Sequence, residues 1–274
     1  MAHRNWDVLV VAHRGIVSGV PENTLAAFRE AIARGFSAIE VDLRATADGH
    51  VVIMHDEDVD RTTSGSGRVS DLTLDEIRSL DAGSHVGPQF ADQKVPTFSE
   101  VLDVVRGTGT KIVLDIKPGP HLDNQHIVEL TERHRATLDV IVGPRSLGDL
   151  RDFKRLNPNL RTLGLVPGEE FAAPDYEAAE EFARSGADMI RLWPPWIFAD
   201  RDRSAAGAVS PLVERMHQLG KPVWTTADVA YRDISPERPR EDLAELLRLG
   251  VSGVLTDVPD LLRDLLAARG ADDR

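Results

Sequence analysis

Eight short apolar runs, each followed by a stretch in which apolar residues recur at helical spacing, constrain the fold of this chain more than any other feature. The runs lie at residues 8–12, 38–43, 111–116, 140–142, 160–166, 189–193, 223–226 and 253–256. The helical stretches lie at residues 25–32, 97–105, 127–135, 147–156, 176–184, 211–219, 243–249 and 261–268. Eight such units predict an α/β chain folded as a (β/α)₈ TIM barrel, with active residues at the carboxyl ends of the strands. A doubly wound open sheet is the alternative.

The alternation of strands and helices breaks once, after the second run. Asp48 and Gly49 form a typical two-residue hairpin turn between residues 41–44 and 51–55. A turn centred there places Asp42 directly opposite His55, and opposed residues share one face of a hairpin. We therefore expect the hairpin to bring this histidine onto the second strand's acidic residues.

Residues 57–95 contain a stretch rich in glycine and serine from Arg61 onward and then show a short helical signal at residues 73–77. Long connections in compact domains are commonly functional. We expect this segment to be a small subdomain or lid inserted within a single barrel domain that spans residues 1–274.

The composition limits the classes of partner. The chain has 274 residues, of which 42% are hydrophobic and 28% charged, and its net charge is −13. Such a balance is typical of a globular chain, and the negative charge argues against nucleic acid or an anionic membrane as a partner. There is no cysteine and no apolar stretch long enough to span a membrane. We expect a soluble, cytoplasmic protein, and the sequence does not indicate its oligomeric state.

Two carboxylates on the second predicted strand have the same orientation. Side chains alternate along a strand, so Glu40 and Asp42 point to one side and Val41 to the other. Carboxylates aimed at one place repel each other unless a cation lies between them, and Mg²⁺ and Ca²⁺ are cations that prefer oxygen ligands. A solvated strand edge is the alternative for the pair alone.

Further polar residues follow the first strand, the hairpin and the third predicted strand. The complete set is His13, Arg14, Glu40, Asp42, His55, Asp115 and Lys117. This inventory suits chemistry at a phosphate ester: three carboxylates hold one divalent cation, two cationic side chains bind the anion and two histidines transfer protons. Taken singly, each histidine could be structural, and Lys117 could simply pair with Asp115.

The same residues lie within motifs that resemble the glycerophosphodiester phosphodiesterase family. The motifs are His13-Arg14-Gly15, Pro21-Glu22-Asn23-Thr24, Glu40-Val41-Asp42, His55-Asp56, Asp60-Arg61-Thr62-Thr63, Val95-Pro96-Thr97, Asp115-Ile116-Lys117, Trp224-Thr225 and Thr256-Asp257 with Pro259. They occur in order over nearly the whole chain, so the resemblance is specific.

The resemblance implies a (β/α)₈ barrel with a small insertion after the second strand. It also implies that Glu40, Asp42 and Asp115 bind one Mg²⁺ or Ca²⁺ ion and that His13 and His55 are the acid–base pair. The reaction it implies splits a glycerophosphodiester into glycerol 3-phosphate and an alcohol. A hydroxyl of the substrate would attack phosphorus, and water would then open the cyclic phosphate.

The resemblance further implies that Trp224 packs against the glycerol carbons, while Arg191 and Trp193 are candidates to extend the pocket. The chain departs from the family at Asp115, where Glu is common, and after Trp224, where Thr-Val-Asn is common. The shorter Asp115 implies that the ion shifts, that a water bridges, or that the strand lies closer. The native ion and the alcohol released are left open by these departures.

Two other functions are compatible with the same barrel. One is a catalytically silent protein that binds a phosphorylated ligand. The other is cleavage of lysophospholipids or phosphosphingolipids, which would need an exposed apolar groove. The candidates for that groove are Phe90, Trp193, Pro194, Pro195, Trp196 and Phe198.

Overall fold

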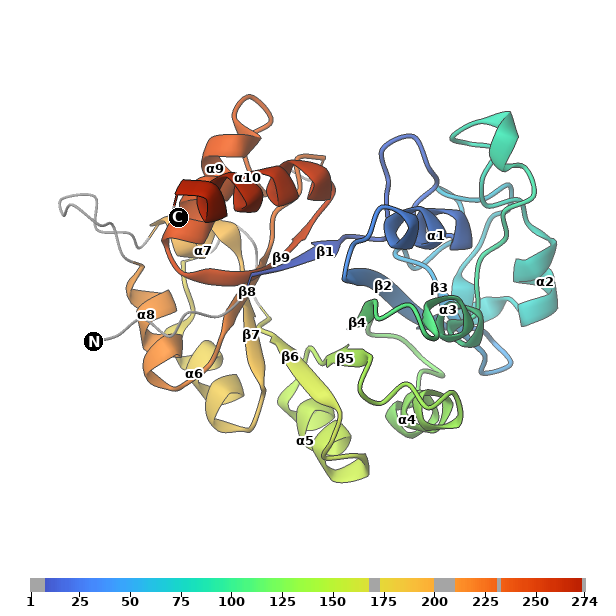
Figure 1. The fold of residues 1–274 in the computed structure, drawn as a ribbon. Helices are drawn as coiled ribbons and strands as arrows, with labels where there is room; N and C mark the ends of the chain where they lie inside the picture. Colours follow the sequence, from blue (N-terminus) through green and yellow to red (C-terminus); the bar gives the residue numbers. More distant parts are fainter. Residues whose placement is uncertain (1–7, 168–172, 200–209, 231–232, 273–274) are drawn as a thin grey trace. The chain divides into compact units, whose positions relative to one another are not determined.

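The computed structural model describes residues 8–167, 173–199, 210–230 and 233–272 (Figure 1). The strands are β1 (Leu9–Ala12), β2 (Ala38–Ala45), β3 (Val51–Ile53), β4 (Lys111–Ile116), β5 (Val140–Gly143), β6 (Arg161–Leu165), β7 (Met189–Leu192), β8 (Val223–Thr226) and β9 (Val251–Thr256). The α-helices are α1 (Leu25–Ala33), α2 (Leu74–Ser79), α3 (Phe98–Val105), α4 (Asn124–Arg133), α5 (Leu147–Leu156), α6 (Tyr176–Arg184), α7 (Pro194–Ala199), α8 (Pro211–Gln218), α9 (Pro239–Arg248) and α10 (Pro259–Asp272). Two short 3₁₀ helices are η1 (Val69–Asp71) and η2 (Pro88–Phe90).

The strand order is β1-β9-β8-β7-β6-β5-β4-β2-β3, with an additional pairing of β1 with β2. All strands except β3 correspond to the eight predicted apolar runs, and β3 pairs with β2 in the antiparallel direction. Strands that follow one another in the sheet in chain order, each with a helix after it, are the topology of a (β/α)₈ barrel and not of a doubly wound sheet. The predicted fold class is therefore confirmed, with one added strand.

The chain divides into two compact units. One comprises residues 12–143 and 152–161, and the other comprises residues 1–11, 144–151 and 162–274. In the first unit, α1 and α3 lie side by side (Figure 1). Thr24 caps the first turn of α1 by accepting a hydrogen bond from the backbone N–H of Ala27, and the buried face of this helix includes Phe28 and Ala31.

The second unit has an apolar core between its strands and helices. Phe182, Leu192, Trp196 and Leu246 are among its buried residues. Trp196 is only 1% exposed, and Pro194 is also buried. The predicted exposed groove was therefore wrong at these two residues, because α7 turns the tryptophan into the core.

The hairpin formed by β2 and β3 has a register one residue away from the predicted one. Leu43 pairs with Ile53, and the N–H of Met54 donates to the carbonyl of Asp42 at 2.9 Å. The loop has three residues and ends at Gly49, whose φ of 80° is left-handed. The prediction that Asp42 lies directly opposite His55 was wrong, because Asp-Gly fits this longer loop as well as a two-residue turn.

The segment at residues 57–95 contains η1, α2 and η2. Thr73 caps α2 in a reciprocal arrangement with Glu76, which explains the helical signal in the sequence. Val59, Val69 and Ile77 pack with Val52 on β3 and with Met54 after it in one small apolar cluster. The interpretation of this segment as an inserted subdomain stays a prediction.

Within the described part of the chain, every helix is too short or too polar to traverse a lipid bilayer.

Candidate active site

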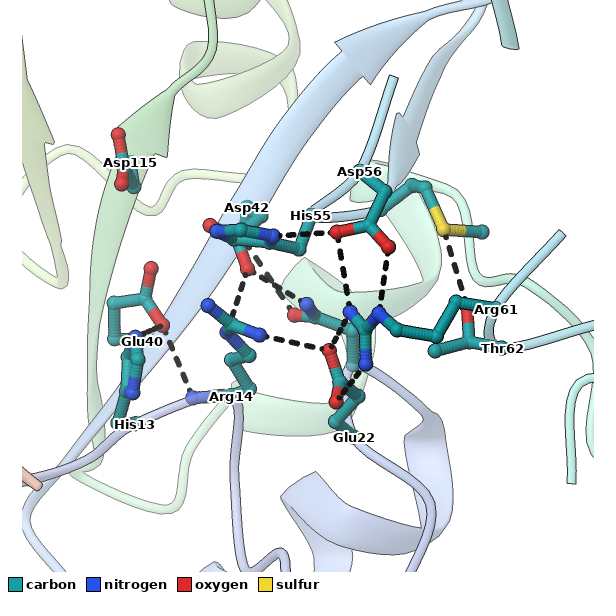
Figure 2. Close-up of polar contacts among 12 residues, drawn as sticks. His13, Arg14, Glu22, Glu40, Asp42, His55, Asp56, Arg61, Thr62 and Asp115 are labelled. Carbon is teal, nitrogen blue, oxygen red and sulfur yellow. Dashed lines mark hydrogen bonds and ion pairs between the residues drawn. The ribbon is translucent and has the colours of Figure 1, made fainter. Parts of the chain in front are cut away.

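Three carboxylates come together toward the carboxyl ends of β2 and β4. Glu40 and Asp42 lie on β2, and Asp115 lies on β4 in register with Asp42. One oxygen atom of each carboxylate lies within 4.8 Å of the others (Figure 2). Glu40 and Asp42 are buried, and Val41 on the opposite face is buried as well, so this part of β2 is covered on both faces. The structure thus brings the three predicted carboxylates to one place.

Lys117 lies among these carboxylates. Its Nζ is 2.8 Å from Oδ1 of Asp42 and 2.7 Å from Oδ2 of Asp115. Burial alone would raise the pKa of Asp42, but Lys117 and Arg14 lower it well below its ordinary value. Burial and the nearby Asp42 carboxylate raise the pKa of Glu40 to about 8. One acidic group is therefore strongly ionised while its neighbour resists ionisation.

His13 and Arg14 lie in the turn that follows β1. The backbone of Arg14 is left-handed, with φ of 56°, and its N–H donates to Oε2 of Glu40 at 3.0 Å. Nε2 of His13 lies 3.7 Å from the same oxygen. The Arg14 guanidinium turns toward Asp42, with its Nε 3.3 Å from Oδ2 (Figure 2). This single turn therefore presents an imidazole, a guanidinium and a main-chain donor to the acidic cluster.

Gly15 makes this turn possible. Its φ is 83°, and a Cβ atom at this position would lie 2.7 Å from Cβ of Ala27 and 2.8 Å from its backbone carbon. Only glycine tolerates both the left-handed backbone and the close approach of α1.

His55 follows β3 but is not part of the strand. Its Nδ1 lies 2.7 Å from Oδ1 of Asp56. Nε and Nη2 of Arg44 donate to its carbonyl oxygen at 3.0 and 2.8 Å. Burial holds the pKa of His55 below its ordinary value, although the charge of Asp42 acts in the opposite direction. His55 thus reaches Asp42 electrostatically, although the register that predicted this contact was wrong.

Several polar residues around the cluster were given no role from the sequence. Nδ2 of Asn23, whose backbone is left-handed, donates to Oδ2 of Asp42 at 2.7 Å. Glu22, Asp56 and Arg61 form hydrogen-bonded ion pairs beside it (Figure 2). All of them lie in the sequence motifs that carry the family resemblance, so their motif membership was the available signal.

Trp224 lies on β8, in the other compact unit. Its ring packs flat on Gly253, where a Cβ atom would lie 2.3 Å from a ring carbon, and it is 4% exposed. In the same unit, the Arg191 guanidinium lies 3.9 Å from the ring centre of Trp193. A substrate contact of these residues stays a prediction.

Residues 13–261 match the sequence profile of the glycerophosphoryl diester phosphodiesterase family. The chain belongs to this family. A glycerophosphodiester phosphodiesterase of Caldanaerobacter subterraneus is 33% identical over 96% of this chain and 99% of the relative. Another from Bacillus subtilis is 32% identical over 93% of this chain and 85% of the relative. The chain is therefore an enzyme of the glycerophosphodiester phosphodiesterase class.

Solved structures of glycerophosphodiester phosphodiesterases and a related phosphodiesterase share the fold. The Oleispira antarctica phosphodiesterase in complex with the product sn-glycerol-3-phosphate has a TM-score of 0.77 at 24% identity, covering 94% of this chain and 96% of that one. A glycerophosphodiester phosphodiesterase from Agrobacterium tumefaciens has a TM-score of 0.72 at 24% identity, covering 93% and 98%. Both likenesses agree with the barrel topology.

Glycerophosphodiester phosphodiesterases depend in general on a divalent metal, and the donor set of this chain fits one. Opposite oxygen ligands of one Ca²⁺ ion lie up to about 5 Å apart, given metal–oxygen distances of about 2.5 Å. The oxygens of Glu40, Asp42 and Asp115 satisfy this limit. Hard carboxylate oxygens suit Mg²⁺ or Ca²⁺, and a bound cation would favour ionised Glu40.

Proposed function

We propose that this enzyme hydrolyses glycerophosphodiesters to glycerol 3-phosphate and an alcohol, with His13 and His55 as the acid–base pair and one divalent cation as cofactor. The observation that supports this most is the convergence of three carboxylates beside two imidazoles in one compact unit. The product named for the Oleispira antarctica structure supports the same reaction.

Glu40, Asp42 and Asp115 are the residues that would hold Mg²⁺ or Ca²⁺. When bound, the cation offsets negative charge on the non-bridging phosphate oxygens. Arg14 and Lys117 bind the same phosphate through charge-assisted hydrogen bonds. Trp224 packs against the glycerol carbons, as the family resemblance implies.

The two histidines divide the proton transfers. One imidazole removes the proton of the substrate's attacking hydroxyl, which forms a bond to phosphorus, while the other gives a proton to the departing alcohol oxygen. A cyclic phosphate and the alcohol result. The roles then reverse as water opens the ring, so both imidazoles return to their starting states. Histidine suits this work because its ordinary pKa of about 6.5 lies close to neutral pH. Burial lowers the pKa of His55, which favours its neutral form as a proton acceptor.

A coupled assay for glycerol 3-phosphate tests this function. Purified protein is offered glycerophosphocholine, glycerophosphoethanolamine and glycerophosphoglycerol, each with Mg²⁺, Ca²⁺ or Mn²⁺. We expect turnover with at least one pair and none after exhaustive treatment with EDTA. Full activity after such treatment contradicts the cofactor, and no glycerol 3-phosphate from any pair contradicts the reaction.

Substitution of the histidines tests their roles. His13→Ala and His55→Ala should each lower kcat by about a thousandfold, within the range typical of general acid–base groups, while the circular dichroism spectrum stays unchanged. His126→Ala is the matched control, since this histidine lies on α4 away from the carboxylates in sequence and should keep full activity. Wild-type turnover in either active-site variant refutes the assignment.

We also propose that residues 57–95 act as an inserted subdomain of a single catalytic domain, and that the enzyme works in the cytoplasm. The small apolar cluster through which the segment packs on Val52 and Met54 supports the first statement. Limited proteolysis tests it, since cleavage should concentrate at the ends of the segment. Cell fractionation tests the second.

A further inference from the structure

We propose that Arg61 is a positioning residue that holds His55 through Asp56 and Arg14 through Glu22. This inference rests on the proposed function, because it assigns a purpose to the geometry of two residues of the proposed site. Among the described residues, the side-chain hydrogen bonds of Arg61 and its two carboxylate partners go to one another, to His55 and to Arg14, so we assign these three residues no catalytic role.

The Arg61 guanidinium binds two carboxylates along two of its edges. Nε and Nη2 donate to Oδ2 and Oδ1 of Asp56 at 2.6 and 3.2 Å. Nη1 and Nη2 donate to Oε2 and Oε1 of Glu22 at 2.8 Å each (Figure 2). Such bidentate pairs fix orientation as well as distance, and a lysine ammonium cannot reproduce them. Arg61 therefore sets the planes of both carboxylates.

Asp56, oriented by Arg61, in turn fixes the orientation of the His55 ring. Its Oδ1 lies 2.7 Å from Nδ1 of the imidazole, which places the proton on Nδ1 and assigns proton transfer to Nε2. The main chain of His55 is held separately by the two donors of Arg44. The ring is thereby fixed from its backbone and from one ring nitrogen, and only the second of these constraints depends on Arg61.

Glu22, also oriented by Arg61, fixes the orientation of the Arg14 guanidinium. Its Oε1 accepts from Nη1 of Arg14 at 2.9 Å, while Nε of the same guanidinium lies 3.3 Å from Oδ2 of Asp42. The two ends of the network thus flank the acidic cluster, one with an imidazole and one with a guanidinium. A misplacement of about 1 Å in such groups is enough to cost about a hundredfold in rate.

A purely stabilising role accounts poorly for this arrangement. The Arg61 side chain is 44% exposed, so solvent screens its ion pairs and keeps their contribution to stability modest. The two arginines and two carboxylates balance in charge, so the network adds no net charge to the site. Hydrogen bonds from Arg61 lower the pKa of Asp56 to about 2, so this carboxylate stays ionised through the neutral range.

The two arms of the network predict different kinetic effects. Asp56→Asn should lower kcat at least tenfold and leave KM within threefold, because it affects proton transfer by His55. Glu22→Gln should raise KM at least fivefold with a smaller change in kcat, because it affects phosphate binding by Arg14. Arg61→Met should do both, and Arg61→Lys should do nearly the same, because charge without the planar fork is insufficient.

Arg78→Met is the matched control. Arg78 lies in the same segment, is 36% exposed and pairs with Glu100, and it also donates to the carbonyl of Val95. This variant should keep kcat and KM within twofold. In the double variant Asp56→Asn/Arg61→Met, kcat should stay within threefold of the Asp56→Asn value, because both substitutions break the same link from Arg61 through Asp56 to His55. Wild-type kinetics in Arg61→Met, or fully additive losses in kcat, overturn the inference.

Nitrogen-15 NMR of labelled histidine separates this inference from the proposed function. The His55 signals are assigned from their absence in His55→Gln. Wild-type protein should show His55 as one neutral tautomer protonated at Nδ1, and Asp56→Asn and Arg61→Met should show a mixture. If both variants show a mixture of tautomers but the wild-type protein has no turnover, the positioning role is supported and the proposed function is refuted. An unchanged His55 spectrum in Arg61→Met refutes the positioning whatever the activity.

Discussion

At the scale of single residues, the turn after β1 depends on Gly15, whose backbone is left-handed and lies against Ala27. The sequence predicted that His13 and Arg14 lie at the end of a strand, because an apolar run precedes them. It could not predict that Arg14 adopts φ of 56° or that its guanidinium reaches Glu22, since such contacts arise only when separate loops meet. The roles of Asp56 and Arg61 were missed for the same reason.

Substitution of Gly15 should be costly. We expect Gly15→Ala to lower the free energy of unfolding by about 2–4 kcal/mol, because it adds a clash with Ala27 to the strain of a left-handed alanine. Gly35→Ala is the control: its φ is 78° and a Cβ atom there meets nothing within 4 Å, so its cost should be about 1 kcal/mol. Urea denaturation measures both. Equal losses of unfolding free energy in the two variants would show that the close approach to Ala27 adds nothing to the cost of Gly15→Ala.

Acid should weaken the contribution of Asp56 to the free energy of unfolding. Its folded-state pKa of about 2 lies below the ordinary value of 3.8, mainly because of the hydrogen bond from Arg61. A lowered folded-state pKa stabilises the fold above pH of about 4, and this contribution is lost as pH falls toward 2. The difference in unfolding free energy between wild type and Asp56→Asn should therefore shrink over that interval in urea titrations. A constant difference would contradict the ion pair.

At the scale of elements, hydrophobic periodicity predicted every strand except β3 as an independent unit, and it predicted α5 and α6 with their observed bounds. The hairpin itself was predicted, but its register was wrong by one residue. Asp48-Gly49 is compatible with loops of two or three residues, and only packing of β3 on its neighbours selects between them. His55 still reaches the site because β3 ends at Ile53, beyond which the alternation of faces no longer applies.

The start of α3 also secures this hairpin. Thr97 caps the helix in a reciprocal arrangement with Glu100, and the carbonyl of Pro96 accepts from the N–H of Ile53 at 2.8 Å. Thr97→Ala should lower the free energy of unfolding by about 1 kcal/mol and speed hydrogen exchange at Ile53. Ser99→Ala is the control, since the Ser99 hydroxyl makes no hydrogen bond to another described residue. This substitution should change stability by less than about 0.5 kcal/mol. Calorimetry and hydrogen exchange measure these effects.

At the scale of the whole molecule, a strongly acidic chain concentrates three of its carboxylates in one partly buried cluster. The sequence predicted this cluster because two strands each end in like-sided charges. Pairing of Lys117 with Asp115 was one of its alternatives and is observed, but the second contact of Lys117, with Asp42, was not predicted. A cation that binds there must share the carboxylates with this ammonium group. Its binding should change the thermal stability of the whole protein.

Divalent cations should raise the melting temperature. At a concentration a hundred times Kd, the added stability is about 2.7 kcal/mol, which corresponds to at least roughly 5 °C for a chain of this size. Asp42→Asn/Asp115→Asn should lose the shift. Glu30→Gln, which changes an exposed carboxylate on α1, should keep it. Differential scanning fluorimetry with Mg²⁺, Ca²⁺ and Mn²⁺ decides, and an equal shift in the double variant would place cation binding elsewhere.

The amide of Arg14 that donates to Glu40 belongs to the polypeptide itself and not to a side chain. Every replacement at this position except proline keeps that N–H, so mutagenesis at residue 14 removes the guanidinium while one anchor of the glutamate survives. Loss of turnover in such variants can therefore be read as loss of the guanidinium, which pairs with Asp42 and which we propose binds the phosphate, while the main-chain hydrogen bond to Glu40 stays in place.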